Sequence, residues 1–209
     1  MKVHSIFDSL QGEGRFQGFP TRFLRLYGCN LRCCYCDAKE SVSGEKYYKS
    51  DVAEIAKILN GDNFQDICIT GGEPFCQLEN LDRLLSEIGT EKRVSIETNG
   101  SFDVSVLGKK HREVCFSIDW KTPSSNNPLF ENKNIEFLKK GNGWLKFVVS
   151  DKSDLKFIEE KQKLLENIEV FVSPVFEKGS DWFNEVQEFV LKNQGLRFQL
   201  QLHKILGIE

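Results

Sequence analysis

The sequence predicts an α/β protein in which mostly parallel strands form a partial, incomplete TIM-type barrel with helices on the outside. Three observations favour this class. Short apolar segments alternate with amphipathic segments, and strand–helix alternation of this kind is typical of parallel sheets. The strands number about seven, near the count of a barrel, but 209 residues are too few for a complete eightfold one. The chain has no internal repeat, low-complexity tract or interdomain linker, which predicts a single domain over 1–209.

Seven segments have the apolar, β-branched and aromatic composition of buried strands. They are residues 21–28, 66–70, 93–97, 114–119, 144–149, 168–173 and 196–201. The first leads directly into residues 28–38, a loop that holds four of the seven cysteines. In barrels and open sheets of parallel strands, ligands bind at the carboxyl ends of the strands. We therefore expect the cysteine loop to meet the loops that follow the next three strands at that edge.

Four segments between these strands have the periodicity of amphipathic helices. They are residues 50–60, 78–89, 153–165 and 181–193. In the first, Ser50 or Asp51 stands at the capping position, and Gly89 is the predicted end of the second. Residues 121–134 are the one turn-rich stretch, and we expect them to form an active-site loop.

The composition is that of an ordinary globular protein, with 40% hydrophobic residues, 28% charged residues and a net charge of −3. This charge offers no electrostatic surface for nucleic acid or an anionic membrane. No apolar run approaches about 18 residues, and the first residues lack the apolar centre of a signal peptide. We therefore expect a cytoplasmic protein, in which thiols stay reduced and clustered cysteines serve metal binding or catalysis. Seven is also an odd number, which argues against full disulfide pairing.

Cys29, Cys33 and Cys36 form a C-x₃-C-x₂-C pattern on the loop that leaves the first predicted strand. Three thiolates suffice for a four-iron, four-sulfur cluster if one iron is left for substrate or cofactor. Structural zinc usually takes four ligands in two separate pairs, and the three histidines of the chain are scattered. Cys34 gives an alternative C-x₄-C spacing with Cys29, but we expect it to point off the loop. Zinc and free thiols remain the alternatives at this point.

A second motif brings a resemblance to a known superfamily. Residues 70–77, TGGEPFCQ, follow the next predicted strand and combine two glycines with a glutamate and a proline. Alone, this segment is typical of a strand-to-helix turn. Together with the three-cysteine pattern it resembles the radical S-adenosylmethionine (SAM) superfamily. The resemblance implies a radical SAM core with two cofactors, a [4Fe-4S] cluster and SAM.

Segments along nearly the whole chain resemble one family of this superfamily, the 7-carboxy-7-deazaguanine synthases of queuosine biosynthesis, a tRNA modification pathway. They are residues 5–37, 95–100, 117–125 and 199–209. The resemblance implies a lyase that abstracts hydrogen from C6 of 6-carboxy-5,6,7,8-tetrahydropterin, contracts its ring, releases ammonia and forms 7-carboxy-7-deazaguanine, a 7-deazapurine. The cofactors would supply the radical chemistry and the protein the positioning. The resemblance also implies a homodimer, and flavodoxin or ferredoxin as the reductant.

Residue roles follow from the same resemblance. Those expected to bind SAM are Tyr35, Asp37, Gly72, Glu73, Asp119 and Lys121. Those expected to bind the pterin are Leu10, Gln11, Gly12, Glu13, Arg25, Thr70, Glu97, His203 and the terminal carboxylate of Glu209. An arginine that points inward from a strand needs an anion, and the pterin carboxylate matches its bidentate fork. A surface ion pair is the alternative for Arg25, and a surface position is the alternative for His203.

The chain departs from the family pattern directly after Cys36 and Asp37. Family members commonly have threonine or serine there, with a hydroxyl that binds Mg²⁺, whereas this chain has Ala38. Magnesium binds through protein oxygens, substrate and water, so we expect weak or no dependence on Mg²⁺. Two other functions stay open. One is a radical SAM activase that installs a glycyl radical on a partner protein. The other, from a different class, is an iron–sulfur electron carrier or a zinc-stabilised binding module.

Overall fold

The computed structural model describes residues 1–61, 63–127 and 133–209, and its strands form one sheet. In chain order the strands are β1 (Lys2–Leu10), β2 (Pro20–Leu26), β3 (Tyr48–Lys49), β4 (Asp66–Gly71), β5 (Arg93–Thr98), β6 (Cys115–Asp119), β7 (Gly143–Val149), β8 (Val170–Pro174) and β9 (Leu196–Phe198). Their order across the sheet is β3-β1-β2-β4-β5-β6-β7-β8-β9. Neighbours from β2 to β9 pair in parallel, whereas β1 pairs antiparallel with β2 and β3. The predicted class, a partial barrel of mostly parallel strands, is confirmed.

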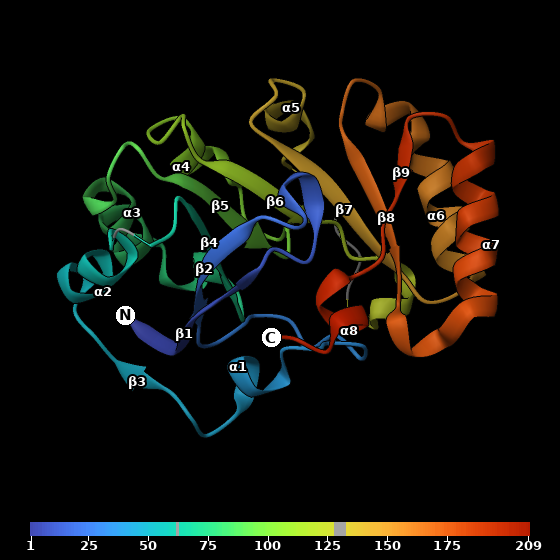
Figure 1. Cartoon of the computed structure of the whole chain (residues 1–209). Coiled ribbons are helices and arrows are strands. Elements are labelled where there is room, and N and C mark those ends of the chain that lie inside the picture. The colour runs from blue at the N-terminus through green and yellow to red at the C-terminus, as the bar shows by residue number, and fades with distance from the viewer. Residues whose placement is uncertain (62, 128–132) are drawn as a thin grey trace.

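Most helices cover the outside of this sheet, whereas α1 and α8 lie on its cavity side (Figure 1). They are α1 (Lys39–Ser43), α2 (Val52–Leu59), α3 (Leu78–Glu87), α4 (Ser105–Gly108), α5 (Ile135–Leu138), α6 (Lys152–Lys161), α7 (Gly179–Lys192) and α8 (Leu202–Leu206). The four predicted helices are present as α2, α3, α6 and α7. Asp51 is the N-cap of α2, but its side chain makes no capping hydrogen bond. Gly89 lies beyond the end of α3, where Ile88 is already extended.

All seven predicted strands are present, and the structure adds two that the sequence did not predict. Strand β1 was missed because Val3 is its one fully buried residue, so it lacks the continuous apolar run of a central strand. Strand β3 has two residues, both exposed. Strand β9 is shorter than predicted and ends at Phe198. Beyond it, the side chains of Gln199 and Gln201 bond to Gly14 and Glu13.

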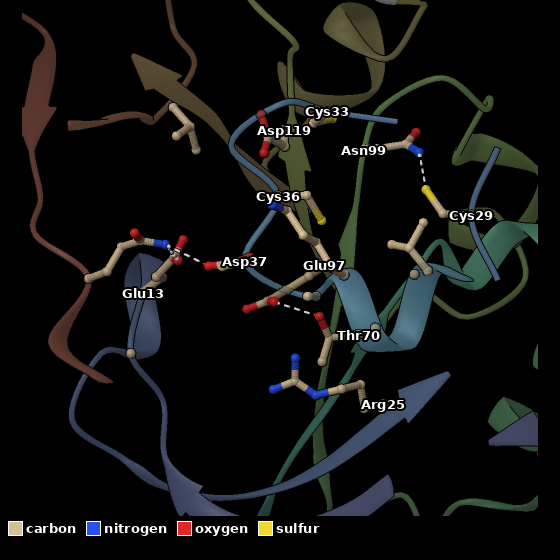
Figure 2. Close-up of a pocket in the computed structure, with 18 of the residues that line it drawn as sticks. Glu13, Arg25, Cys29, Cys33, Cys36, Asp37, Thr70, Glu97, Asn99 and Asp119 are labelled. Atoms are coloured by element: carbon tan, nitrogen blue, oxygen red, sulfur yellow. Dashed lines mark hydrogen bonds between the residues drawn. The ribbon is translucent and has the colours of Figure 1, made fainter. Parts of the chain in front are cut away.

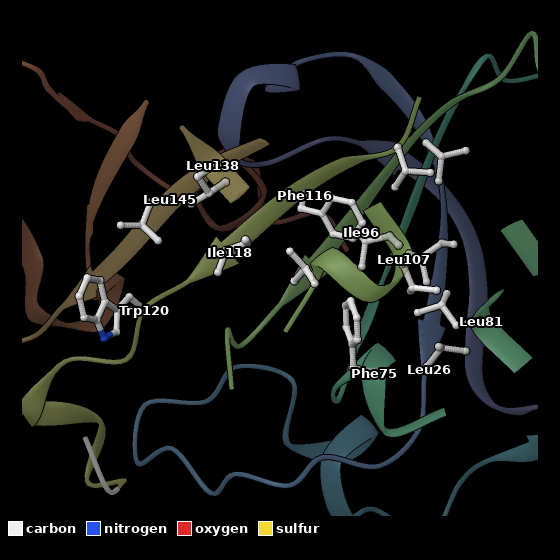
Figure 3. Close-up of a cluster of buried hydrophobic side chains, with 14 of the residues drawn as sticks. Leu26, Phe75, Leu81, Ile96, Leu107, Phe116, Ile118, Trp120, Leu138 and Leu145 are labelled. Carbon is white, nitrogen blue, oxygen red and sulfur yellow. The ribbon is translucent and has the colours of Figure 1, made fainter. Parts of the chain in front are cut away.

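Side chains on the parallel strands alternate between a core face and a cavity face, as the period of two requires. On β7, Leu145, Phe147 and Val149 are buried in the hydrophobic core, whereas Lys146 and Val148 line a cavity. The neighbouring strands repeat this alternation, and Figure 3 shows Ile96, Phe116, Ile118 and Leu145 within the core cluster. The core therefore fixes which side chains the strands present to the cavity.

The predicted active-site loop, 121–134, lies partly outside the described residues, at 128–132. Its described start is a turn over Pro123–Ser125, anchored by the Thr122 hydroxyl, which donates to the carbonyl oxygen of Val148 at 3.1 Å. Asn134 at its end is buried and donates to the carbonyl oxygen of Phe102 at 2.9 Å. Within the described ranges, no helix is both long enough and apolar enough to cross a membrane.

Candidate active site

A cavity of about 410 Å³ lies at the carboxyl ends of the parallel strands (Figure 2). Eighteen of the residues singled out in the sequence line it, and they come from the amino-terminal segment, the cysteine loop, the strand ends and the carboxyl terminus. They are Leu10, Gln11, Gly12, Glu13, Arg25, Cys29, Cys33, Tyr35, Cys36, Asp37, Ala38, Thr70, Gly72, Glu97, Asp119, Lys121, His203 and Glu209. The predicted convergence of loops at this edge of the sheet is confirmed.

Three of the four clustered thiols face the cavity and one does not. Cys29, Cys33 and Cys36 are half-buried and line its wall. Cys34 is exposed and turned away, with its Sγ donating to the carbonyl oxygen of Ser124 at 3.0 Å. The structure thus divides the cysteines as the sequence predicted, with the C-x₃-C-x₂-C set facing inward and Cys34 pointing off the loop.

Two asparagine side chains support the inward thiols. Asn127 donates through Nδ2 to Cys33 Sγ at 3.1 Å, and Asn99 donates to Cys29 Sγ at 3.7 Å. Burial raises the pKa of the Cys33 thiol, whereas the positive charge of Lys121 lowers it. Among the described residues, no three His, Cys, Asp or Glu side chains are grouped as ligands of a single metal ion. A [4Fe-4S] cluster does not need that geometry, because each thiolate binds a different iron, so the three cavity-facing thiols fit the cluster.

Glu73 does not face the cavity, which differs from the predicted contact with SAM. Its side chain is fully buried behind the cavity wall. One carboxylate oxygen accepts from Phe75 N at 3.0 Å and from the Thr98 hydroxyl at 2.8 Å. The other accepts from Asn99 N at 2.7 Å. Burial raises the pKa of Glu73 to about 7, against these hydrogen bonds, which lower it. The carboxylate therefore holds the end of β5 to the glycine-rich turn.

The two glycines before Glu73 allow the turn after β4 to press against the start of the cysteine loop. A Cβ on Gly72 would lie 2.0 Å from the carbonyl oxygen of Gly28. A Cβ on Gly71, which has a φ of +120°, would lie 2.2 Å from the carbonyl oxygen of Leu26. Gly72 N donates to the carbonyl oxygen of Leu26 at 2.9 Å, and Glu73 N donates to that of Gly28 at 2.8 Å. The glycines thus fix the height of the cysteine loop above the sheet.

A charged pair lies at the carboxyl end of β6. Lys121 Nζ donates to one carboxylate oxygen of Asp119 at 2.7 Å, and both side chains are largely buried. The other oxygen of Asp119 is buried and has no hydrogen-bond partner within the described ranges. The Lys121 ammonium also lies 5.8 Å from the centre of the Tyr35 ring. A buried, unpartnered acceptor at this position suits a ligand with hydroxyl or amino donors.

Arg25 enters the cavity from β2, on the side away from Cys33 and Asp119 (Figure 2). Its guanidinium lies 5.2 Å from the centre of the Phe7 ring. Its buried Nε has no hydrogen-bond partner in the described part of the chain. The alternative of a surface ion pair does not fit this placement. A guanidinium that lines a cavity with an unused donor suits a planar anion such as a carboxylate.

Glu97 is held between two polar neighbours above Arg25 (Figure 2). Its two carboxylate oxygens accept from the Thr70 hydroxyl at 2.8 Å and from Gln11 Nε2 at 3.3 Å. The side-chain oxygen of Gln11 stabilises the turn that follows β1, because Oε1 accepts a hydrogen bond from Glu13 N at 3.1 Å. Three residues predicted to bind the pterin therefore form one hydrogen-bonded chain along the cavity.

The amino-terminal turn docks onto the carboxyl-terminal helix. Leu202 N donates to the carbonyl oxygen of Gly12 at 3.0 Å, and a Cβ on Gly12 would lie 2.2 Å from His203 Nδ1. Lys204 bridges Asp37 and Glu177, with distances of 3.6 and 3.1 Å. His203 and Glu209 both line the cavity.

The sequence did not predict several residues that the cavity exposes. They are Asn99, Ser117, Lys146, Gln201 and Lys204 on its wall and Asn127 behind Cys33. Lys146 is the most informative of them, because its Nζ lies 2.5 Å from Glu13 Oε2. The sequence contained a signal for Lys146, because a charged residue inside an otherwise apolar strand indicates a face that does not pack in the core.

Comparisons with known proteins identify the family of this chain. The chain matches the model of the Radical SAM superfamily over residues 24–140. Two relatives are named 7-carboxy-7-deazaguanine synthase. The one from Methanospirillum hungatei is 37% identical over 100% of this chain and 86% of its own. The one from Thermoplasma acidophilum is 33% identical over 99% of this chain and 97% of its own.

Solved structures support the fold. QueE from Escherichia coli matches with a TM-score of 0.73 at 21% identity, covering 95% of this chain and 93% of that one. Streptococcus suis SuiB bound to its precursor peptide SuiA matches with a TM-score of 0.61 at 18% identity, covering 88% of this chain and 50% of that one. From the superfamily match and the full-length relatives, we conclude that the chain belongs to the radical SAM superfamily and, within it, to the 7-carboxy-7-deazaguanine synthase family.

Proposed function

We propose that this protein is a 7-carboxy-7-deazaguanine synthase that contracts the ring of 6-carboxy-5,6,7,8-tetrahydropterin with loss of ammonia. The observation that carries the proposal is one cavity with three cysteines on one wall and, on another, the half-buried Arg25, whose Nε has no hydrogen-bond partner in the described ranges, in a chain whose relatives bear this name along their full length. A glycyl-radical activase or an iron–sulfur electron carrier is not favoured. Neither would need a guanidinium inside the cavity opposite the thiols.

Membership of the superfamily implies a [4Fe-4S] cluster and SAM. Once bound, the cluster and SAM would supply the one-electron radical chemistry needed to abstract hydrogen from the pterin. In our proposal Cys29, Cys33 and Cys36 hold the cluster. SAM lies beside it, among Tyr35, Asp37, Gly72, Asp119 and Lys121, which line the cavity next to the cysteine loop. The chain itself orients both ligands and excludes water around them.

The pterin would occupy the opposite side of the cavity. Arg25 binds its carboxylate, and Glu13 and Glu97 accept from N–H groups on its ring edge. Gln11 and Thr70 hold Glu97 in place, at 3.3 and 2.8 Å. Leu10 and Gly12 give shape to this wall, and His203 and Glu209 close the mouth of the cavity. This arrangement brings both predicted sets of site residues, except Glu73, around one space.

The test is anaerobic turnover of 6-carboxytetrahydropterin by the reconstituted full chain with SAM and reductant, with mass spectrometry of the product. Iron and sulfide are counted in parallel. Alanine at Cys29, Cys33 or Cys36 is expected to lower iron content and abolish product. Cys34→Ala is the matched control, since it removes a thiol from the same loop. It is expected to keep the iron content and the product formation of the wild type. Product formation that survives any of the three cavity-facing substitutions would overturn the proposal.

We further propose that activity depends weakly or not at all on Mg²⁺. Ala38 lines the cavity but has no side-chain oxygen, and the neighbouring Asp37 carboxylate lies 3.6 Å from Lys204 Nζ. Turnover after removal of divalent cations with a chelator is expected to match turnover with added Mg²⁺. Activity that disappears with the chelator and returns with magnesium alone would contradict this.

The remaining proposals concern the protein as a whole. We propose one domain over 1–209, a homodimer, a cytoplasmic location in which all seven thiols stay reduced, and flavodoxin or ferredoxin as the electron donor. The seven cysteines are all unpaired, which supports the reducing location. Sedimentation analysis tests the dimer. Product yield with flavodoxin or ferredoxin and its reductase, compared with a chemical reductant, tests the donor.

A further inference from the structure

Lys146 is a charged residue in the middle of a strand that is otherwise apolar. On β7 it stands between Leu145 and Phe147, which are both fully buried in the core. The alternation of the strand turns Lys146 to the opposite face, where it lines the cavity with only 13% of its side chain exposed. A buried ammonium requires a partner, because desolvation of an unpaired charge is costly.

The partner of Lys146 is Glu13. Lys146 Nζ donates to Glu13 Oε2 at 2.5 Å, and Gln201 Nε2 donates to Glu13 Oε1 at 2.6 Å. The carboxylate is therefore held from two sides, by the central sheet and by the segment that leads into α8. Each carboxylate oxygen can accept two hydrogen bonds, so Glu13 keeps an acceptor position on each oxygen for a ligand.

Other charges surround this pair. Burial alone would lower the pKa of Lys146, but Glu13, together with Asp119 and Glu97 at the ends of β6 and β5, raises it. His203 from α8 faces Glu13, and Asp37 from the cysteine loop shares Gln201 with it at 3.5 Å. Burial alone would raise the pKa of Glu13, but Lys146 and Gln201 lower it to about 2. Lys146 is thus the nearest cation that can keep Glu13 ionised.

We propose that Lys146 is a positioning residue that keeps Glu13 ionised and in one orientation, as an acceptor for the N–H donors of a bound amino-oxo heterocycle. The inference rests on the proposed function for the identity of that ligand. Without Lys146, a buried Glu13 would take up a proton near neutral pH and present a donor where the ligand also presents donors. Binding would then become dependent on pH, which a purely structural role for Lys146 would not produce.

The variants are Lys146→Met, which removes the charge at similar length, and Lys146→Arg, which keeps it. Kinetics with the pterin are measured from pH 5.5 to 9. Lys146→Met is expected to lose about 10- to 100-fold in kcat/KM at pH 6 and to recover as the pH rises, with most of the change in KM. Lys146→Arg is expected to keep the flat profile of the wild type. Lys110→Met is the control, since it breaks the exposed pair with Asp82 outside the cavity.

A second measurement does not depend on turnover. Infrared spectra of the full chain are recorded across the same pH range. Wild type is expected to show the protonated-carboxyl band of Glu73 near neutral pH. Lys146→Met is expected to show an additional protonated-carboxyl band that is absent from wild type and from the double variant Glu13→Gln/Lys146→Met. If no additional band appears, or if Lys146→Met keeps the pH profile of wild type, the positioning role is wrong. If the additional band appears but wild type converts no pterin, the proposed function fails while the role of Lys146 stands.

Discussion

Arg25 is a half-buried cation whose buried Nε has no hydrogen-bond partner in the described ranges. Its guanidinium lies against Phe7, which covers one face but offers no acceptor. A buried donor left unsatisfied costs about 1–3 kcal/mol. An anionic ligand that supplies the acceptor removes this cost, and the free energy recovered contributes to binding. At the residue scale, the cavity is therefore already organised for a carboxylate.

Arg25→Met is expected to lower kcat/KM for the pterin about 10- to 100-fold, mostly through KM, because one charge-assisted contact is lost. Arg25→Lys is expected to have a kcat/KM between those of the wild type and Arg25→Met, since lysine keeps the charge but not the planar fork. SAM binding, measured by calorimetry on the reconstituted protein, should not change. An unchanged KM in Arg25→Met would mean that the pterin carboxylate lies elsewhere.

Glu73 gives a prediction about stability. Burial raises its pKa to about 7 in the folded chain, whereas the ordinary value is 4.5. The folded state therefore binds more protons than the unfolded state between pH 4.5 and 7, and the free energy of unfolding falls as the pH rises through that window. Glu73→Gln should lack this fall, which amounts to up to about 3 kcal/mol. Urea unfolding at pH 5, 6, 7 and 8 measures it, with Glu79→Gln on the exposed face of α3 as control. A wild-type minus variant difference that stays constant with pH would contradict the assignment.

At the scale of elements, the site depends on how closely the turn after β4 approaches the cysteine loop. The contact is between backbones, since a Cβ on Gly72 would meet the carbonyl of Gly28 at 2.0 Å. No side chain can rotate away to relieve such a contact. The same turn orients Glu73, which ties it to the end of β5 through Thr98 and Asn99. One element therefore sets the positions of two cavity walls.

Gly72→Ala is expected to destabilise the chain by about 1–3 kcal/mol and to lower its iron content, because the cysteine loop must move away from the sheet. Gly89→Ala is a matched control. There the added Cβ would meet the flexible end of the Glu91 side chain, which can move aside. Urea unfolding and iron analysis measure both variants. A Gly72→Ala protein with normal stability and iron content would show that the close approach is dispensable.

For the whole molecule, the cavity is closed by parts from both ends of the chain. The turn after β1 and helix α8 meet through Leu202 N and the carbonyl oxygen of Gly12, at 3.0 Å. Helix α8 has no buried residue, so the core does not rely on it. Its contribution is to the mouth of the cavity, where His203 and Glu209 lie.

Removal of residues 202–209 is therefore expected to leave the fold nearly intact and to impair the site. The Tm should fall by less than about 4 °C, because the lost contacts are few and exposed. Pterin turnover should fall at least about tenfold, through loss of one or more ligand contacts. Thermal unfolding and circular dichroism test whether the fold is kept, and product analysis tests whether the site is impaired. Full turnover by the shortened chain would show that α8 takes no part in the site.

The sequence predicted central elements better than peripheral ones. The strands 66–70 and 93–97 were found because β-branched residues recur at every second position on the side that faces the core, which is the period of a strand. β1 pairs antiparallel near the edge and has one fully buried residue, so its pattern carries little signal. Glu73 was predicted to contact SAM but lies behind the cavity wall. A sequence motif does not show whether its carboxylate contacts a ligand or the backbone.

The sequence by itself determined the α/β class, the C-x₃-C-x₂-C set and the loops that carry the site, because strand periodicity and ligand spacing are local properties of the chain. Only the tertiary structure decided which polar groups share the cavity. Lys146 and Glu13 are 133 positions apart and meet at 2.5 Å because the sheet and the amino-terminal turn bring them together. Distances of that kind depend on packing across the whole molecule, which no local pattern encodes.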